Sequence, residues 1–395
     1  MSKYGSNKMY YGTIVAGAAL SLAIALFSGC SDSLSSESAS PKLGDMNEEK
    51  ADRKSRTIQI NGTNTALITT INGYSFSVQS SPARVEVLSG NAKVATFTDK
   101  CYTVSMAGPS RTFTEVNSVS GSTNMTTYSV THGTWVRKLT APFSIAVYNS
   151  NTMAQKEVLK QWLYDAIIAN QNGVPDVLET AMQYIAGASA QTGIFNNKSV
   201  QMYGDATYSS GGDYNDYFQV TINYTNPWTK TDAPEANEAL SLDCSGYMRM
   251  IWGARSNSSG SYTDGQIPLS IDKNGSWDNS NNTMTRTSYA MYANSPGEVI
   301  IAHTGATAMN QVSKLNIGDL VFFDDNIGTS ASKINHVGMY IGQWTQPGTA
   351  TSYARFISSR TSINGPTMGD YKGASLLNYS TTSKYTKTFC AARRL

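Results

Sequence analysis

Cys244 has the clearest chemical potential of any residue in this sequence. Residues 243–246 are Asp-Cys-Ser-Gly, and Tyr247, Met250 and Ile251 follow at the spacing of an apolar helix face. This spacing predicts a helix that begins at Cys244. The unpaired N–H groups and the positive dipole end of a helix N-terminus lower the pKa of a thiol and can hold an oxyanion. The alternative is a small buried cysteine at the start of a core helix.

Three histidines could serve such a thiol as a base: His132, His303 and His336. Residues 336–342 are His-Val-Gly-Met-Tyr-Ile-Gly, which predicts a strand with apolar side chains on one face and the histidine on the other. Residues 318–323, Gly-Asp-Leu-Val-Phe-Phe, predict a turn and a buried strand that pairs with it in antiparallel fashion. A strand histidine can equally be structural, and we expect His132 and His303 to be packing or loop residues.

Together, residues 243–246, 318–323 and 336–342 resemble the motifs of the NlpC/P60 family of papain-like bacterial cell-wall cysteine peptidases, in family order. The resemblance extends over about residues 203–395. It implies an α+β domain in which a nucleophile helix packs on an antiparallel sheet. It also implies that Cys244 is the nucleophile and that His336 is the base, which takes the thiol proton and later protonates the leaving amine. No metal or other cofactor is expected.

The third catalytic residue is where this sequence departs from the family. The family usually places a His, Asn or Gln on the strand after the histidine strand, and here residues 356–360 are Phe-Ile-Ser-Ser-Arg. Ser358 occupies the family position. A hydroxyl can accept the imidazole N–H but orients the ring less firmly than an amide does. A backbone carbonyl or another residue in that role, and an ordinary strand serine, are the alternatives.

The resemblance also suggests substrate contacts. Family members often cleave the bond between γ-D-glutamate and a diamino acid in peptidoglycan stem peptides, and some hold a free N-terminal ammonium with an acidic residue and a tyrosine. By this resemblance Asp216 and Tyr217 line such a pocket, and Arg360 binds a substrate carboxylate. The remaining substrate-binding candidates are Asp213, Asp243 and Ser245. A solvated loop and a surface ion pair are the alternatives.

The start of the chain has the pattern of an export signal. Lys3 and Lys8 precede an apolar run at residues 14–27, which is too short for a comfortable transmembrane helix. The following Ser-Gly-Cys, residues 28–30, resembles the lipobox of bacterial lipoproteins. We therefore expect Cys30 to carry lipid and to anchor the exported chain to a membrane, the outer one in a Gram-negative host. An ordinary signal peptide and a signal anchor are the alternatives.

The predicted organisation has five parts. Residues 1–29 form the signal peptide, and the polar residues 30–56 form a flexible tether. Residues 57–150 show short alternating strands with tight turns, which predicts a small β module similar in architecture to bacterial SH3-like modules. Residues 151–203 have helical periodicity and predict a helical connector. Residues 204–395 form the peptidase domain.

Charge and cysteine count narrow the function further. The chain has 30 basic and 28 acidic residues, and the leader contains two lysines and no acidic residue. The rest of the chain is therefore formally neutral and does not favour a nucleic-acid partner. If Cys30 is lipidated, three cysteines remain: Cys101, Cys244 and Cys390. At least one of their thiols then has no disulfide partner in the same chain. The prediction is a monomeric, lipid-anchored cysteine endopeptidase acting on peptidoglycan stem peptides. An amidase or acyltransferase on a non-wall substrate and an inactive surface-binding lipoprotein are the alternatives.

Overall fold

The fold is described from a computed structural model, which describes residues 54–61, 73–118, 125–195, 197–224, 230–254, 258–259, 262–263, 265, 267–270, 283–328, 330–369 and 375–395. All of them belong to one compact unit, Pro41–Leu395. The predicted signal peptide and the lipidation site Cys30 lie outside the described residues. Strand β1 (Lys54–Asn61) begins inside the predicted tether, so residues 54–56 belong to a sheet instead.

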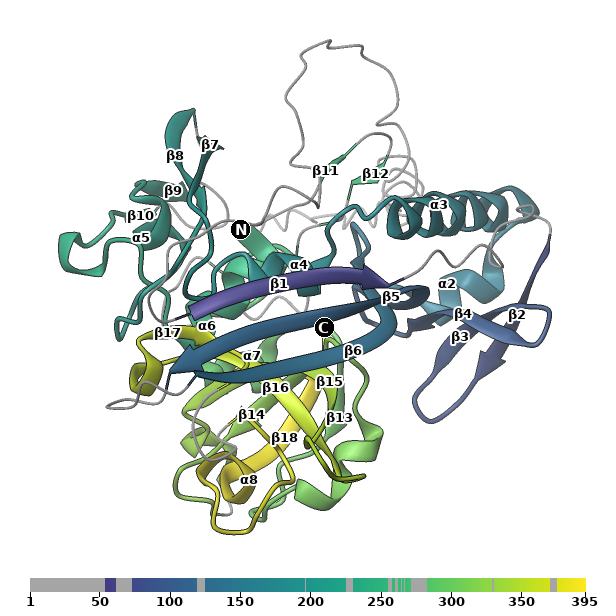
Figure 1. Ribbon diagram of the computed structural model, residues 1–395. Coiled ribbons are helices and arrows are strands. Elements are labelled where there is room, and N and C mark those ends of the chain that lie inside the picture. The colour runs from purple at the N-terminus through teal and green to yellow at the C-terminus, as the bar shows by residue number, and fades with distance from the viewer. Residues whose placement is uncertain are drawn as a thin grey trace, which may run out of the picture. The chain divides into compact units, whose positions relative to one another are not determined.

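The N-terminal sheet is antiparallel, with the order β1-β5-β4-β3-β2 and with β6 also paired to β5 (Figure 1). Its other strands are β2 (Tyr74–Gln79), β3 (Arg84–Ser89), β4 (Ala92–Thr98), β5 (Thr103–Ser118) and β6 (Met125–Lys138). Strand β3 shows the alternation expected of a half-buried strand, with Val85 and Val87 in the core, whereas the last five residues of β4 are all buried. The β-rich character matches the prediction, and the likeness to SH3 modules stays a prediction.

Three helices follow: α2 (Ile145–Ser150), α3 (Met153–Gln171) and α4 (Val177–Met182). The apolar face of α3 packs on the N-terminal sheet, and the side chain of Asp176 caps α4 by accepting from two backbone N–H groups. The predicted helical connector is only partly helical, because residues 191–203 form the hairpin of β7 (Gln191–Phe195) and β8 (Lys198–Tyr203). Among the described residues, no helix is both long enough and apolar enough to cross a membrane.

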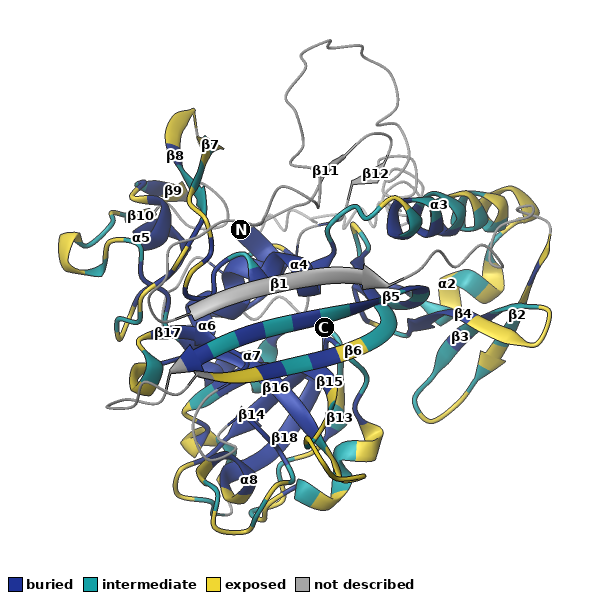
Figure 2. Ribbon diagram, viewed as in Figure 1, coloured by how far each residue is buried: buried dark blue, intermediate teal, exposed yellow. Residues whose placement is uncertain are grey.

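The C-terminal sheet has the order β13-β18-β14-β15-β16-β17, and all its pairs are antiparallel. Its strands are β13 (Glu298–Ile301), β14 (Leu320–Phe323), β15 (His336–Thr345), β16 (Ser352–Arg360), β17 (Gly365–Thr367) and β18 (Phe389–Arg394). The pairing of β14 with β15 confirms the predicted antiparallel neighbours. Figure 2 shows β14 and β18 buried along their whole length, as expected for central apolar strands.

Shorter elements surround this sheet: α5 (Tyr214–Phe218), β9 (Ile222–Tyr224), β10 (Lys230–Asp232), η3 (Ala236–Glu238), α6 (Cys244–Arg249), the π-helical turn η4 (Met250–Ala254), β11 (Ser258–Ser259), β12 (Tyr262–Thr263), α7 (Ser288–Asn294), η5 (Met309–Lys314), η6 (Ala331–Lys333), η7 (Thr361–Ile363) and α8 (Lys384–Thr388). The helix α6 packs on β15 and β16. A mixed α and β domain with a helix on an antiparallel sheet agrees with the predicted fold class.

The N-terminal and C-terminal sheets share one apolar core. Phe113 and Val130 from the N-terminal sheet belong to the same buried cluster as Met248 of α6 and Val337 of β15, and β6 packs against β15. The residues predicted as a separate β module therefore complete the core of the predicted peptidase domain.

A buried ion-pair cluster fixes the N-terminal sheet to α4. Arg111 of β5 contacts Asp176 over 2.5 Å and Glu179 over 2.7 Å, and all three side chains are almost fully buried. The ring of Trp135 lies 3.7 Å from the Arg111 guanidinium carbon. Loss of one partner from such a cluster leaves an uncompensated buried charge, so these contacts strongly favour one arrangement of strand and helix.

Candidate active site

Helix α6 begins at Cys244, as predicted. Asp243 caps it, because the Asp243 Oδ1 accepts from the Gly246 N–H over 2.7 Å. Gly246 lies so close to the backbone carbonyl of Gly212 that a Cβ at this position would overlap the oxygen. The Asp-Cys-Ser-Gly segment thus supplies a cap, the thiol and the close backbone approach that sets where the helix starts.

The Cys244 thiol is buried at this helix start. Its sulfur lies 3.4 Å from Ser288 Oγ and interacts with the backbone N–H of Val337. Burial, followed by the negative charge of Asp243, raises the pKa of the Cys244 thiol to about 11. The prediction of a lowered pKa is therefore wrong for this structure, because the cost of desolvating a thiolate outweighs the stabilisation from the helix start and from the Val337 N–H.

His336 is the first residue of β15, and its imidazole faces the predicted third residue. His336 Nε2 lies 3.1 Å from Ser358 Oγ, which is on the neighbouring strand β16. The imidazole also contacts the rings of Phe323 and Tyr385, with centroids 5.5 and 5.3 Å away. Burial and then the positive charges of Arg360 and Lys384 hold the pKa of His336 well below its usual value.

Cys244 and His336 are brought into the same region without a hydrogen bond between them. The sulfur interacts with the N–H of Val337, the residue that directly follows His336. Cys244 belongs to the core under α6, whereas the His336 ring contacts aromatic residues of a second cluster that includes Phe323. Catalytic hydrogen bonds are often long before substrate binds, so this arrangement is compatible with a thiol and base that approach during reaction.

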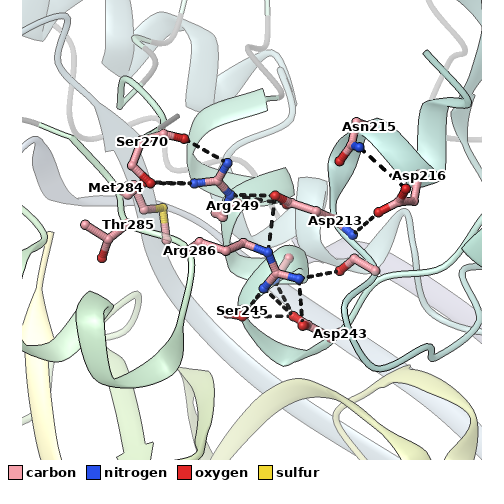
Figure 3. Close-up of polar contacts among 12 residues, drawn as sticks. Asp213, Asn215, Asp216, Asp243, Ser245, Arg249, Ser270, Met284, Thr285 and Arg286 are labelled. Carbon is pink, nitrogen blue, oxygen red and sulfur yellow. Dashed lines mark hydrogen bonds and ion pairs between the residues drawn. The ribbon is translucent and has the colours of Figure 1, made fainter. Parts of the chain in front are cut away.

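A network of charged side chains lies beneath the start of α6 (Figure 3). Arg286 contacts both carboxylate oxygens of Asp243, at 3.0 and 2.7 Å, and also donates to Ser245 Oγ. Arg249 Nε lies 2.9 Å from Asp213 Oδ2. Burial favours a neutral Asp243, but the charge and hydrogen bonds of Arg286 lower the pKa of that carboxyl. These contacts position α6, the helix that begins at Cys244.

The sequence of this region matches the model of a known protein family. Residues 230–361 match the family model of the NlpC/P60 family. Over these residues the chain is similar to the NlpC/P60 family. A search of curated proteins and a search of solved structures gave no match. The NlpC/P60 family consists generally of cysteine peptidases and amidases, so the match indicates a cell-wall hydrolase of that class.

Three predicted substrate contacts, Asp213, Asp243 and Ser245, prove to be bonded to other groups of the protein. The carboxylates of Asp213 and Asp243 are paired with arginines, and Ser245 Oγ bonds to both Asp243 and Arg286. All three side chains lie in the buried network, where each stabilises another protein group. The structure therefore gives them a structural role, because sequence alone did not show that arginines from distant segments would reach them.

Asp216 and Tyr217 lie just before the matched residues 230–361, and only Asp216 lines a pocket. Tyr217 is fully buried, and its hydroxyl donates to the Gly204 carbonyl over 2.9 Å, so its predicted place in a substrate pocket is wrong. Asp216 lines a small pocket together with Gly211, Asp213, Asn215, Asp232 and Glu235. Burial and a side-chain hydrogen bond with Glu235 raise the pKa of Asp216 to about 7.

One acidic cluster could in principle hold a metal ion among the described residues. The carboxylates of Asp216, Glu235 and Glu238 lie within 4.8 Å of one another. Two Asp216 oxygens already accept the backbone N–H groups of Asp213 and Glu235. Burial and the side-chain hydrogen bond with Glu235 raise the pKa of Asp216, so its carboxyl is more easily protonated than an exposed one.

Arg360 is not free to bind a substrate carboxylate. It is 2% exposed, its Nε donates to Ser358 Oγ over 2.7 Å, and its NH2 group donates to Ser375 Oγ over 2.9 Å. Its guanidinium also lies over the rings of Phe356 and Tyr385, at 4.7 Å from each centroid. The predicted role is wrong because the strand that carries Arg360 directs it into the domain.

The other histidines and cysteines lie away from the thiol. His303 Nε2 lies 3.6 Å from Asp324 Oδ2, and His132 Nδ1 accepts from the backbone N–H of Thr134. Both agree with the predicted packing roles. Cys101 and Cys390 are buried and carry free thiols, so they do not pair with each other.

Sequence reasoning missed three residues around the nucleophile. Ser288 contacts the Cys244 sulfur, and Arg286 pairs with Asp243. The half-buried Tyr208 also interacts with Cys244, and burial is the main cause that raises the pKa of its hydroxyl. The sequence signal for this pair was Arg286, an isolated arginine between the apolar residues Met284 and Met291. A guanidinium that is buried with such neighbours needs a carboxylate partner.

Proposed function

We propose that this protein is a cysteine endopeptidase that cleaves peptidoglycan stem peptides, at the bond between γ-D-glutamate and a diamino acid. The observation that carries the proposal is the placement of Cys244 at the start of α6, beside the first residues of the β15 strand of an NlpC/P60 region. A thiol at a helix N-terminus has backbone N–H groups beside it that can hold the oxyanion of a tetrahedral intermediate.

The proposed reaction runs through a thioester. His336 takes the Cys244 thiol proton, the sulfur attacks the peptide carbonyl, and the protonated imidazole then gives its proton to the leaving amine. Water hydrolyses the thioester and regenerates the thiol. Ser358 contacts the second side of the imidazole at 3.1 Å and is proposed as the third catalytic residue.

The proposed substrate contact is electrostatic. Asp216 lines a small acidic pocket with Asp232 and Glu235, and this set of carboxylates complements a substrate ammonium group. A bound ammonium would take the place of the proton that Asp216 shares with Glu235. Binding of a free stem-peptide amine is therefore the proposed role of this pocket.

The proposal includes location and organisation. The signal sequence and Cys30 would leave the chain exported and attached to a membrane by lipid, at the outer membrane in a Gram-negative host, which keeps a monomeric enzyme close to the wall. The N-terminal β region is proposed to be an SH3-like module that supports the peptidase. No nucleic-acid partner is proposed, because the chain after the leader is formally neutral.

The test compares Cys244→Ala with the parent full chain, purified in detergent and incubated with defined muropeptides. We expect the parent to release fragments cut after γ-D-glutamate, as read by mass spectrometry, and the variant to lose this activity by at least about a thousandfold. Cys101→Ala is the matched control, because Cys101 is also a buried free thiol. Equal release by Cys244→Ala and the parent would refute the proposal, and cleavage of a non-wall amide alone would indicate the amidase or acyltransferase alternative.

A second candidate is a binding lipoprotein that keeps the fold without activity. The neutral thiol and the absence of a hydrogen bond between Cys244 and His336, both described residues, favour it. The same incubation separates the two, since a binding protein would retain muropeptides unchanged.

A further inference from the structure

Three polar side chains form a hydrogen-bonded series on the side of the C-terminal sheet that carries His336. Arg360 Nε donates to Ser358 Oγ over 2.7 Å, and Ser358 Oγ lies 3.1 Å from His336 Nε2. Ser358 is fully buried and Arg360 is 2% exposed. Both come from β16, and His336 comes from the adjacent β15, so the series is built into two paired strands.

The direction of each hydrogen bond follows from the chemistry of the groups. A guanidinium has donors and no acceptor, so Arg360 must use a lone pair of Ser358 Oγ. A buried hydroxyl also needs an acceptor for its own hydrogen. In the part of the chain that the structure describes, the acceptor that Ser358 reaches is His336 Nε2. Ser358 therefore donates to Nε2, and a neutral His336 carries its hydrogen on Nδ1.

We propose that Arg360, acting through Ser358, is a positioning residue that keeps His336 as the neutral Nδ1–H tautomer. A family member with an amide or imidazole in place of Ser358 can accept a hydrogen from Nε2–H instead. Here Arg360 uses one of the two lone pairs of Ser358 Oγ, and the Ser358 hydrogen, which cannot point at the Arg360 donor, is directed at the ring. The departure from the family pattern therefore reverses the direction of the hydrogen bond to the base.

This tautomer opposes the proton transfer that the proposed reaction needs. A ring with its hydrogen on Nδ1 accepts a second proton at Nε2, where Ser358 already donates. When the Cys244 S–H bond breaks and a new N–H bond forms on His336, the Ser358 hydrogen loses its acceptor and an imidazolium forms beside Arg360. The resting pair is therefore a neutral thiol and a neutral imidazole, and thiolate formation requires the Ser358 contact to break.

The charges around His336 support this resting state. Arg360 on β16 and Lys384 on α8 both act on the imidazole, and each disfavours a cationic ring. Phe323 of β14 and Tyr385 of α8 cover the ring with aromatic surface. Lys384 lies 3.5 Å from the partly exposed Asp325, whereas Arg360 is buried, so Arg360 is the less screened of the two cations.

Nitrogen NMR of the full chain with labelled histidines tests the tautomer directly. We expect the His336 Nδ1 signal in the protonated range and the Nε2 signal in the unprotonated range at neutral pH, assigned by their loss in His336→Gln. His132 is an internal contrast, because its Nδ1 accepts from Thr134 and its hydrogen must be on Nε2. A protonated Nε2 on His336 in the native chain would overturn the inference, whatever the variants do.

A matched pair of variants tests the role of Arg360. Arg360→Met removes the donor and the charge, and we expect the pKa of His336 to rise and Nε2 to gain the hydrogen. Arg355→Met removes another buried arginine of the same strand, whose guanidinium contacts Tyr128 and Trp344, and should leave the His336 signals unchanged. Arg360→Lys should partly restore the native signals. Identical His336 titrations in the two methionine variants would contradict the proposal.

Only the consequence for reaction rate rests on the proposed function. The nitrogen NMR measurement of the tautomer needs no substrate. A hydrogen found on Nε2 of His336 would therefore overturn the tautomer inference and leave the peptidase proposal unaffected. Unchanged muropeptide release by Cys244→Ala would refute the peptidase proposal and leave the Arg360–Ser358–His336 series intact.

Discussion

Burial affects the pKa of each of the three thiols in the described part of the chain more strongly than the secondary structure around it does. Burial raises the pKa of Cys101 and of Cys390 to about 12, and the pKa of Cys244 to about 11, although Cys244 starts a helix. A thiolate loses more by leaving water than it gains from a short helix dipole. The nucleophile proposed here therefore rests as a thiol.

This difference predicts how Cys244 reacts with iodoacetamide. Near pH 7 the folded chain should be alkylated at Cys244 at least about tenfold more slowly than the urea-unfolded chain, because the thiolate fraction falls tenfold for each unit that the pKa rises. The rate should keep rising up to about pH 11. Peptide mass spectrometry measures it, with Cys101 and Cys390 as internal controls. A fast reaction that is independent of pH above 6 would show a resting thiolate.

Sequence predicts individual residues well where their role is local. The places of Cys244 at a helix start and of His336 at a strand start follow from short patterns in the chain. The partners of Asp243 and Arg360 do not, because Arg286 lies 43 residues from Asp243 and Ser375 lies 15 residues from Arg360. Tyr217 was misplaced for a related reason, since its polar neighbours hid a side chain that packs in the core.

At the scale of elements, the position of α6 depends on a close backbone contact. Gly246 faces the carbonyl of Gly212 and the Cα of Asp213, both backbone atoms that cannot rotate away. The first turn of the helix therefore lies directly against the loop that carries Asp213. A side chain at this position has to move either the loop or the helix that presents the thiol.

Gly246→Ala should therefore destabilise the protein by about 1–3 kcal/mol, the usual cost of overpacking, and displace the thiol. Gly328→Ala is the matched control, since its nearest neighbour would be the Asn326 carbonyl at 3.6 Å, an ordinary contact, and it should change stability by less than about 0.5 kcal/mol. Urea unfolding measures both. Equal urea midpoints for the two variants would show that the loop carrying Asp213 moves aside without a cost in stability.

Elements were predictable where one periodicity ran through the segment. The strands β3, β14 and β15 and the helix α6 follow from their apolar patterns, although only β3 alternates in burial, whereas β14 and α6 are buried throughout. The hairpin of β7 and β8 was missed because it follows two helices with no strong alternation of its own. The shared core was missed because a strand pattern shows which face is apolar and not which distant element covers that face.

At the scale of the whole molecule, His132 connects the two sheets. It lies on β6, and a Cβ at Gly342 of β15 would meet its imidazole carbon at 3.1 Å, so the ring fills the space that this glycine leaves. Burial, and then the charge of Arg111, lower the pKa of His132 to about 4. Protonation of this residue thus works against the packing of one sheet on the other.

Acid should therefore weaken the fold through His132. The ordinary histidine pKa is about 6.5, so between pH 6.5 and 4 the unfolded chain binds a proton that the folded chain does not. The unfolding free energy should fall over this window by at most about 3 kcal/mol. The raised pKa of Asp216 makes the unfolding free energy rise as the pH falls, which opposes the effect of His132. The measurement is therefore the difference in unfolding free energy between His132→Asn and the parent at each pH. Parallel stability curves from pH 7 to 4 would rule out this role.

The place of β18 has a consequence for how the chain reaches its native state. Residues 389–394 pair between β13 and β14, and Arg394 donates to the side chain of Thr98, 296 residues earlier. The C-terminal sheet cannot close until synthesis has reached this strand, which supplies the neighbour of both β13 and β14. Such distant pairing makes folding slow, and it leaves a long interval in which aggregation competes with it.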